Sequence, residues 1–229
     1  MKSVQTPGSE DATNCGLLRE RAYSELKSRI LCGQLEQAPF LSTRGLATEL
    51  GMSLSPVRSA IERLENEGLL SIGPQRGIVV HNLTTNEIVD HFEIRQALET
   101  LVVRKLATRI STCQLEQLRA NVAAYEKCLR TNNVEAFITR DSEFHLLLAE
   151  YAGNADIERV LRQLRDRIFR IVMRVIEHVP QRMQASVDEH RRILDLLEQG
   201  DGVRAAKYMV EHLRRGLNTL VPGNGRKRN

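Results

Sequence analysis

The sequence predicts a mainly α-helical protein: an N-terminal winged helix-turn-helix with a small β-hairpin wing, then a C-terminal antiparallel bundle of about six helices. Three observations predict this fold. Apolar residues recur at helical spacing over most of the 229 residues. One pair of short strand-like runs stands near residue 70. The chain is 41% hydrophobic but only 4% aromatic and contains no Trp, which favours a Leu- and Ala-rich helical core over a large β-sandwich.

Residues 41–70, LSTRGLATELGMSLSPVRSAIERLENEGLL, are predicted to form two short helices joined by a tight turn. The first spans 43–50, and Gly51 follows it where a helix C-cap favours positive φ. Ser53 is the expected N-cap of the second helix, and Pro56 stands in its first turn, where the missing N–H costs little. The apolar stripe of the second helix comprises Val57, Ala60, Ile61 and Leu64.

The opposite side of the second helix carries short polar side chains and one long cation: Ser55, Arg58 and Ser59. Small residues allow close approach to DNA, hydroxyls can donate to phosphates, and Arg58 can reach a phosphate or a guanine edge. This surface therefore indicates a helix that lies in a DNA major groove.

The flanking segments complete the winged-helix order. An amphipathic helix is predicted over 17–32, with a possible short strand at Phe40–Leu41. Runs at 69–72 and 78–81 predict a β-hairpin, because Gly and Pro interrupt the sequence between them. Arg76 and Gly77 at its tip could reach an adjacent minor groove or a phosphate.

Charge gives little support for DNA binding by a broad basic field. The sequence pI is about 9.0 and the net charge is +4. Residues 1–82, however, contain as many acidic as basic residues, so the whole excess comes from residues 83–229. Contact with DNA must therefore depend on a few well-placed cations and backbone N–H groups.

Composition also excludes several classes of protein. The four Cys residues are scattered without a CxxC pair, which argues against a secreted disulfide framework. The N-terminus lacks a signal-peptide pattern, and no apolar run approaches the ~20 residues of a membrane span. We therefore expect a protein of the reducing cytoplasm.

The domain boundaries follow from the change in sequence pattern near residue 84. We expect a DNA-binding domain over 15–82, a linker at 83–86 and a helical domain over 87–222, with 1–14 and 223–229 disordered. The basic tail GNGRKRN could instead touch DNA. The six helices are predicted at 85–109, 112–131, 133–151, 154–179, 183–199 and 202–220.

Three His and one Asp of the helical domain could form a divalent-metal site. Asp141 and His145 are four residues apart on one predicted helix, so they project from one face. His190 and His212 belong to two later helices, and apolar residues flank each of them. Imidazole suits Zn, Ni, Cu or Fe, and a single carboxylate leaves coordination positions open. The alternative is that these His residues are separate, half-buried or exposed groups.

Arg95 is a second candidate in the helical domain. It lies between apolar Ile94 and Leu98, and Glu99 is available for an ion pair at i+4. Arg95 could alternatively line an internal cavity and hold a carboxylate bidentately. Its sequence position leaves both interpretations open.

These motifs together resemble the GntR family of bacterial transcription regulators, in its FadR-like branch with the all-helical FCD effector domain. The resemblance extends from about residue 17 to 220. The segment 41–70 followed by RGIVV is similar to the DNA-reading unit of the family. HFEIRQALE resembles the start of the effector domain, and DSEFHLLLAEYAGN, DEHRRIL and EHLRRG resemble its metal-binding form.

The resemblance implies a homodimeric, cytoplasmic regulator of double-stranded, pseudo-palindromic operator DNA, most commonly a repressor. It implies metal ligation by Asp141, His145, His190 and His212, with Zn expected and Ni, Fe or Mn as alternatives. A small carboxylate effector would bind against this metal and contact Arg95. The implied DNA-binding residues are Arg44, Ser53, Ser55, Arg58, Arg76 and Gly77.

One departure concerns base reading. Many members of the family carry Arg where this chain has Leu54. Leu cannot make a bidentate contact with guanine, although it can meet a thymine methyl group. The operator is therefore expected to differ from the usual family sequence, with Arg44 and Arg58 contributing more of the base reading.

Two other functions fit some of these features. The metal ion itself could be the signal that the regulator senses. A helical metal-dependent enzyme could also use a three-His, one-Asp site to activate water. The sequence places no general base or nucleophile around that site, so we expect a regulator and not an enzyme.

Overall fold

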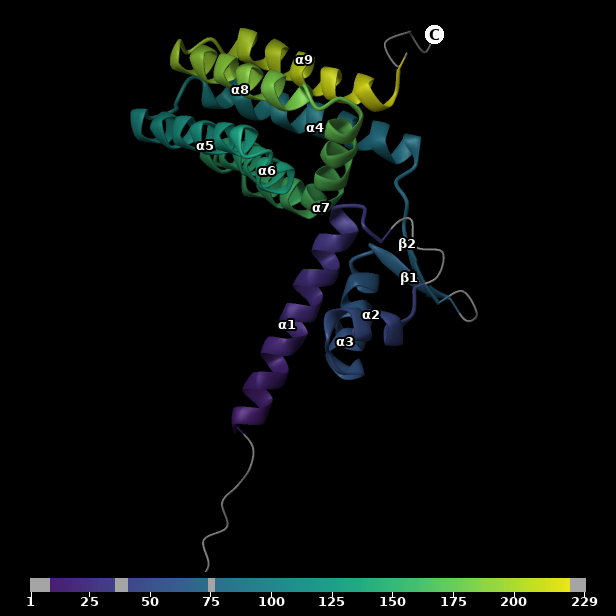
Figure 1. Cartoon of the computed structure of the whole chain (residues 1–229). Coiled ribbons are helices and arrows are strands. Elements are labelled where there is room, and N and C mark those ends of the chain that lie inside the picture. Colours follow the sequence, from purple (N-terminus) through teal and green to yellow (C-terminus); the bar gives the residue numbers. More distant parts are fainter. Residues whose placement is uncertain (1–8, 36–40, 74–76, 223–229) are drawn as a thin grey trace, which may run out of the picture. The chain divides into compact units, whose positions relative to one another are not determined.

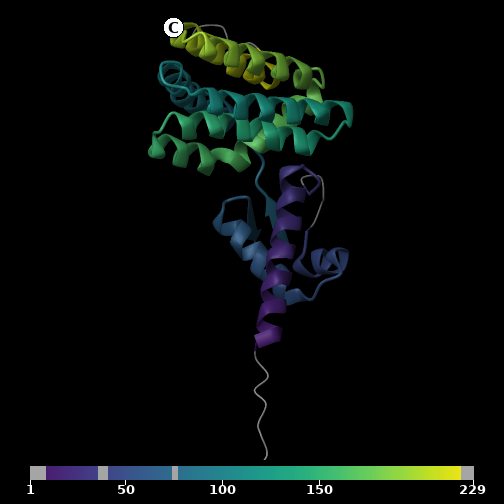
Figure 2. The ribbon, with the colours of Figure 1, turned by 90° about the vertical axis from the view of Figure 1, so that its left-hand side faces the viewer.

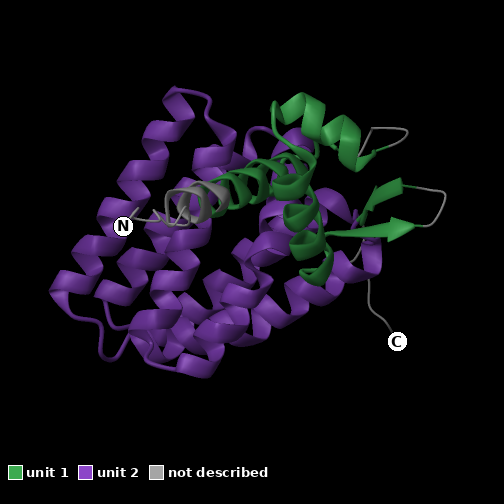
Figure 3. Ribbon diagram, turned by 90° about the horizontal axis from the view of Figure 1, so that it is seen from below, with its two compact units in different colours: residues 1–82 green, residues 83–229 purple. Residues whose placement is uncertain are grey.

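The computed structural model describes residues 9–35, 41–73 and 77–222, although the side chains of 9–15 are not described. It divides into two compact units, residues 1–82 and 83–229 (Figure 3). The division between Asn82 and Leu83 falls where the sequence pattern changes. Each unit is described separately below.

The first unit contains the helix-turn-helix and the hairpin (Figure 1). Its elements are α1 (Ser9–Leu31), α2 (Thr43–Leu50), α3 (Leu54–Asn66), β1 (Leu70–Gly73) and β2 (Gly77–Val80). The two helices of the helix-turn-helix have the predicted extents. Helix α1 begins well before the predicted start at Leu17, so residues 9–14, expected to be disordered, are part of this helix.

Local interactions fix the tight turn between α2 and α3. The Ser42 hydroxyl accepts a hydrogen bond from Gly45 N at 3.0 Å and caps α2. Gly51 ends the helix in the left-handed region at φ 61°, as predicted. Helix α1 packs against α3, and their contact buries Leu26, Ile30 and Ile61 almost completely.

The wing is a two-stranded antiparallel hairpin with Leu70 opposite Val80 and Gly73 opposite Gly77. Leu41 adds an isolated bridge to Ile78, where a short strand was predicted; its neighbour Phe40 lies outside the described residues. A carboxylate on α3 anchors the first strand, because Glu65 Oε1 accepts a 2.8 Å hydrogen bond from the backbone N–H of the partly exposed Ile72.

The second unit is a helical bundle, and its helices agree with the six predicted segments to within a few residues. They are α4 (Thr85–Leu106), α5 (Thr112–Arg130), α6 (Val134–Tyr151), α7 (Ala155–His178), α8 (Arg182–Glu198) and α9 (Gly202–Leu220). Polar N-caps start most of them, including reciprocal capping boxes at α4 and α5. Helices α8 and α9 lie together on one side of the bundle, and α9 also packs along α4 (Figure 2).

Candidate functional site

The exposed face of α3 presents the residues predicted to contact DNA. Ser55 and Arg58 are exposed there, and Arg44 is exposed on α2. Leu54 is also exposed, with 45% of its surface accessible. The apolar stripe of α3 is buried against the rest of the unit. Burial of one face therefore fixes which side of α3 remains available to a partner.

The N-terminus of α3 is suited to bind a phosphate. Ser53 occupies the N-cap position, as predicted, but its side chain makes no capping hydrogen bond. No acidic residue stands in the first turn of α3. The free backbone N–H groups and the helix dipole can therefore favour an anion there. Gly77 begins β2 with φ 69°, whereas Arg76 lies outside the described residues.

Three helices of the second unit bring three His side chains together. His145 comes from α6, His190 from α8 and His212 from α9, and all three are buried. One potential ligand nitrogen from each lies within 4.8 Å of the others. The tertiary structure thus assembles the predicted His residues, and they can hold a metal ion.

Each imidazole has a second partner at its Nδ1 atom. His145 Nδ1 lies 2.5 Å from Glu99 Oε2, and His212 Nδ1 lies 2.7 Å from Glu189 Oε2. His190 Nδ1 is 2.5 Å from the hydroxyl of Tyr125. A proton on Nδ1 leaves the lone pair on Nε2, which is the arrangement that second-sphere partners give to metal-binding His.

The Nε2 atoms fit a shared cation. His190 Nε2 and His212 Nε2 face each other at 3.2 Å. His145 Nε2 is buried and has no hydrogen-bond partner among the described residues. Buried polar atoms are seldom left without a partner. A metal ion between these nitrogens would satisfy all three, so the residues present fit such an ion.

Burial favours the neutral form of two of these imidazoles. Burial, together with repulsion from the neighbouring imidazoles, lowers the pKa of His190 well below its usual value. Burial also lowers the pKa of His212, although Glu189 opposes the shift. Neutral imidazole is the metal-binding form. Burial raises the pKa of Glu189, but hydrogen bonds from His212 and Arg182 outweigh it and bring the pKa to about 2.

Asp141 lies beside the three-His cluster. Its Oδ1 accepts a hydrogen bond from Ser186 Oγ at 3.0 Å and is 3.9 Å from His190 Nδ1. Asp141 does not belong to the group of ligand atoms within 4.8 Å. Its role as a fourth ligand therefore stays a prediction.

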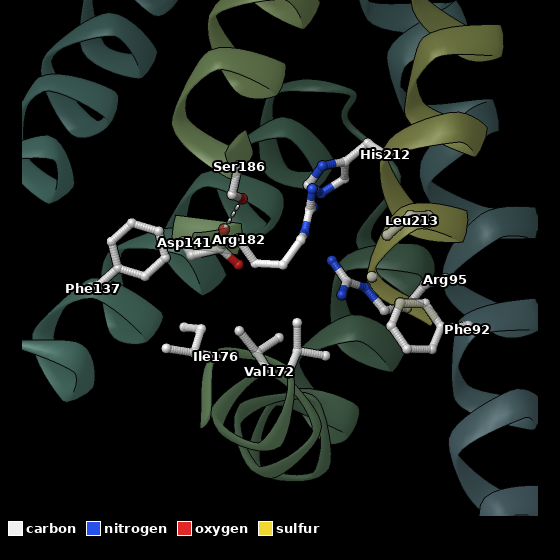
Figure 4. Close-up of a pocket in the computed structure, with 12 residues that line it drawn as sticks. Phe92, Arg95, Phe137, Asp141, Val172, Ile176, Arg182, Ser186, His212 and Leu213 are labelled. Carbon is white, nitrogen blue, oxygen red and sulfur yellow. Dashed lines mark hydrogen bonds between the residues drawn. The ribbon is translucent and has the colours of Figure 1, made fainter. Parts of the chain in front are cut away.

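A pocket adjoins the cluster (Figure 4). Its polar lining residues are Arg95, Asp141, Arg182, Ser186 and His212. Its apolar lining residues include Phe92, Phe137, Val172, Val175, Ile176 and Leu213. The guanidinium group of Arg95 points into the space that these residues enclose, whereas the side chain of Arg182 extends towards His212 (Figure 4). Arg95 thus fits both sequence interpretations, since it lines the pocket and also pairs with Glu99 at 2.6 Å.

Several residues of this site were absent from the sequence prediction. Glu99 was considered only as a partner of Arg95, and Tyr125, Glu189, Arg182 and Ser186 were not singled out. No spacing rule could have found Tyr125, because it lies 65 residues from His190. Glu189 is adjacent to His190 in the sequence, yet it supports His212 on the next helix. Only the packing of the helices reveals these pairs.

A winged helix-turn-helix followed by a helical unit is an architecture of DNA-binding transcriptional regulators. Comparison with known families supports this class. Residues 18–80 match the bacterial regulatory proteins of the gntR family, and residues 90–215 match the FCD domain. The chain belongs to the GntR family of transcriptional regulators and carries an FCD domain. It is a regulator and not an enzyme.

Curated relatives are regulators of similar length. The transcriptional repressor RspR of Escherichia coli is 27% identical over 197 residues, 86% of each chain. A probable D-xylose utilization operon repressor of Paenarthrobacter nicotinovorans is 26% identical over 219 residues, 94% of this chain and 96% of the relative. The gluconate operon repressor of Bacillus subtilis is 26% identical over 178 residues, 76% and 70% of the two chains.

Solved structures show the same fold. Escherichia coli McbR/YncC has a TM-score of 0.71 at 21% identity, covering 89% of this chain and 97% of that chain. A putative GntR regulator from Rhodococcus sp. RHA1 has a TM-score of 0.71 at 18% identity, covering 90% and 98%. Within the described part of the chain, no helix combines the length and apolar character that crossing a membrane requires.

Proposed function

We propose that this regulator is a homodimeric repressor whose affinity for a pseudo-palindromic operator is controlled by a small organic acid bound at a metal site in the helical unit. The observation that carries the proposal is the three-His cluster with a pocket beside it. Each Nδ1 lies within 2.7 Å of an oxygen atom of a second residue. His212 and Asp141 also line the pocket.

His145, His190 and His212 would hold the ion, with Asp141 as the expected fourth ligand and Zn as the expected metal. The ion would supply a Lewis acid that binds a carboxylate oxygen. Arg95 offers a second contact for that carboxylate. Its Nε donates to Glu99, and neither Nη atom has a hydrogen bond to another described residue. A guanidinium held in this way can bind a carboxylate bidentately.

Helix α7 offers a connection from the pocket to the start of the helical unit. Val172, Val175 and Ile176 on this helix line the pocket. Arg174 on the same helix donates from Nη1 to the backbone oxygen of Leu83 at 3.2 Å. Leu83 directly follows the DNA-binding unit in sequence. An acid that moves α7 would therefore act on the residue that joins the two units.

On DNA, two copies of α3 would enter successive major grooves. Arg44, Ser53, Ser55 and Arg58 would make the contacts, with Arg76 and Gly77 contributed by the wing. A coupling free energy of about 1–3 kcal/mol would change operator occupancy roughly 5- to 150-fold. Gel filtration with light scattering should show a dimer, and a monomer at operator-binding concentrations would contradict the dimeric part of the proposal.

A mobility-shift experiment tests the control by metal and acid. Binding sites are first selected from random duplex DNA with the purified full-length protein. Operator affinity is then measured for apo protein, Zn-loaded protein and Zn-loaded protein with a panel of organic acids. The proposal expects an acid to weaken binding only when metal is present. If chelation alone changes operator affinity and no acid has an effect, the metal ion is the signal instead.

A further inference from the structure

The pocket beside the His cluster is enclosed by polar groups on one side and by an apolar wall on the other. Arg95, Arg182 and His212 face the same space as Phe137, Val172 and Ile176 (Figure 4). The polar groups restrict the charge that a ligand can carry, and the apolar wall restricts the surface that the ligand can bury.

The arginine side chains around the pocket are paired with carboxylates. Arg182 is bound bidentately by Glu189, with both of its Nη atoms at 2.9 Å from a carboxylate oxygen. Arg95 is paired with Glu99 through Nε. Asp141 contributes a third carboxylate. Glu189 also accepts a hydrogen bond from Arg215 Nη1 at 3.0 Å, so its carboxylate is shared between two guanidinium groups.

Glu189 holds both Nη atoms of Arg182, which leaves the Nη atoms of Arg95 and the ion of the proposed function to bind a ligand carboxylate. A second carboxylate on the ligand would be buried without a compensating cation, which is strongly unfavourable. The free Nη atoms of Arg95 and the ion mark where the single carboxylate would bind. The remaining wall offers no charged group to a second ligand anion, because Phe137, Val172 and Ile176 form it (Figure 4).

The size of the apolar part depends on a close helix contact. Gly216 on α9 lines the pocket, and a Cβ atom at this position would lie 3.3 Å from Cε1 and Cζ of Phe92. The absence of a side chain at Gly216 lets the Phe92 ring pack against α9. An alanine there would force the ring to move, and the ring borders the pocket.

From this geometry we infer that the effector is a monocarboxylic acid with an apolar body, held by its carboxylate at Arg95 and the metal and by its body against the wall of Phe137, Val172 and Ile176. This inference rests on the proposed function, since it assigns the chemical class of the acid at that same site. Gly216 and Phe92 set the room available to the apolar body.

Isothermal titration calorimetry on the Zn-loaded full-length protein tests this inference with four probes: acetate, 4-methylpentanoate, glutarate and the neutral 4-methylpentanamide. Each methylene buried against the wall should raise affinity about fourfold. We therefore expect 4-methylpentanoate to bind at least about tenfold more tightly than acetate, glutarate or the amide.

Two variants with a matched control distinguish the contribution of the apolar wall to ligand affinity from that of the carboxylate-binding groups. Val172→Thr keeps the side-chain shape but puts a hydroxyl in the wall, and should weaken 4-methylpentanoate about tenfold while leaving acetate unchanged. Gly216→Ala should act in the same direction by displacing Phe92. The control is Val203→Thr, because Val203 is 68% exposed on α9 and does not line the pocket.

The outcomes distinguish this inference from the proposed function. Tighter binding of glutarate than of 4-methylpentanoate would overturn the inference and leave an acid-controlled regulator intact. An equal loss of acetate and 4-methylpentanoate binding in Val172→Thr would also overturn it, because the wall would then not contact the body. If no acid binds the Zn-loaded protein, both the inference and the control of the regulator by an acid fail.

Discussion

The buried carboxylate of Glu99 joins the pocket to the His cluster, and its replacement gives the sharpest test of the site. Glu99 Oε1 is 2.6 Å from Arg95 Nε, and Oε2 is 2.5 Å from His145 Nδ1. Burial raises the pKa of this carboxyl. The nearby Arg95 and His145 lower the pKa by more than burial raises it, so it lies well below its usual range. Oε1 accepts a hydrogen bond from Arg95 Nε, and Oε2 forms an ion-pair contact with His145.

Glu99→Gln keeps the shape of the side chain and replaces one acceptor oxygen with an NH₂ donor. Arg95 Nε can only donate, so the amide oxygen must face it, and the amide NH₂ must then face His145. His145 Nδ1 becomes an acceptor, and its proton moves to Nε2, the atom required for the metal. Loss of such a second-sphere partner costs about 10- to 100-fold in metal affinity, or about 1.4–2.7 kcal/mol. We expect the upper part of this range because the tautomer is inverted.

Metal affinity measured by chelator competition gives the first readout, and long-range ¹H–¹⁵N NMR of apo protein gives the tautomer of His145. The matched control is Glu143→Gln on α6, because Glu143 is more exposed and pairs with Arg140 at 2.8 Å. This control should bind metal like the wild type. Unchanged metal affinity in Glu99→Gln, or a wild-type His145 protonated at Nε2, would refute the reasoning.

Four further outcomes are expected. Arg58→Ala should abolish specific operator binding with an unchanged circular dichroism spectrum, and tight specific binding in a mobility shift would contradict the assignment of α3. His190→Ala should lower the bound metal found by elemental analysis, whereas full occupancy would exclude His190 as a ligand. The pKa of Glu189 is about 2 in the folded protein against a usual value of 4.5. Glu189 therefore contributes at most about 3 kcal/mol to the free energy of unfolding above pH 4.5, and this contribution is lost as the pH falls towards 2. In Glu189→Gln, thermal stability should fall less steeply between pH 5 and 2. Arg174→Gln should leave acid binding intact but reduce the effect of the acid on operator affinity, and an unchanged effect would show that the contact with Leu83 does not carry the coupling.

The local sequence determined where the helices of this protein begin and end. Helix ends are set by interactions within a few residues, so Gly51, with φ 61°, and the Thr84–Glu87 capping box mark them directly. The apolar stripe of α3 likewise fixed which side of the helix is exposed, because helical periodicity assigns residues to faces. The same periodicity placed Asp141 and His145 on one face of α6. It could not show that Asp141 accepts a hydrogen bond from Ser186 and lies outside the group of three His ligand atoms.

Tertiary structure decided which side chains meet. His145, His190 and His212 converge because α6, α8 and α9 pack around one interior, and this packing depends on contacts between residues far apart in the sequence. The partners of their Nδ1 atoms follow from the same packing, as Tyr125 and Glu99 show. Sequence patterns encode the period of a helix but not its rotation against its neighbours. The sequence alone thus determined the class of regulator and its candidate metal ligands, whereas the pocket and the groups that orient those ligands required the folded helices.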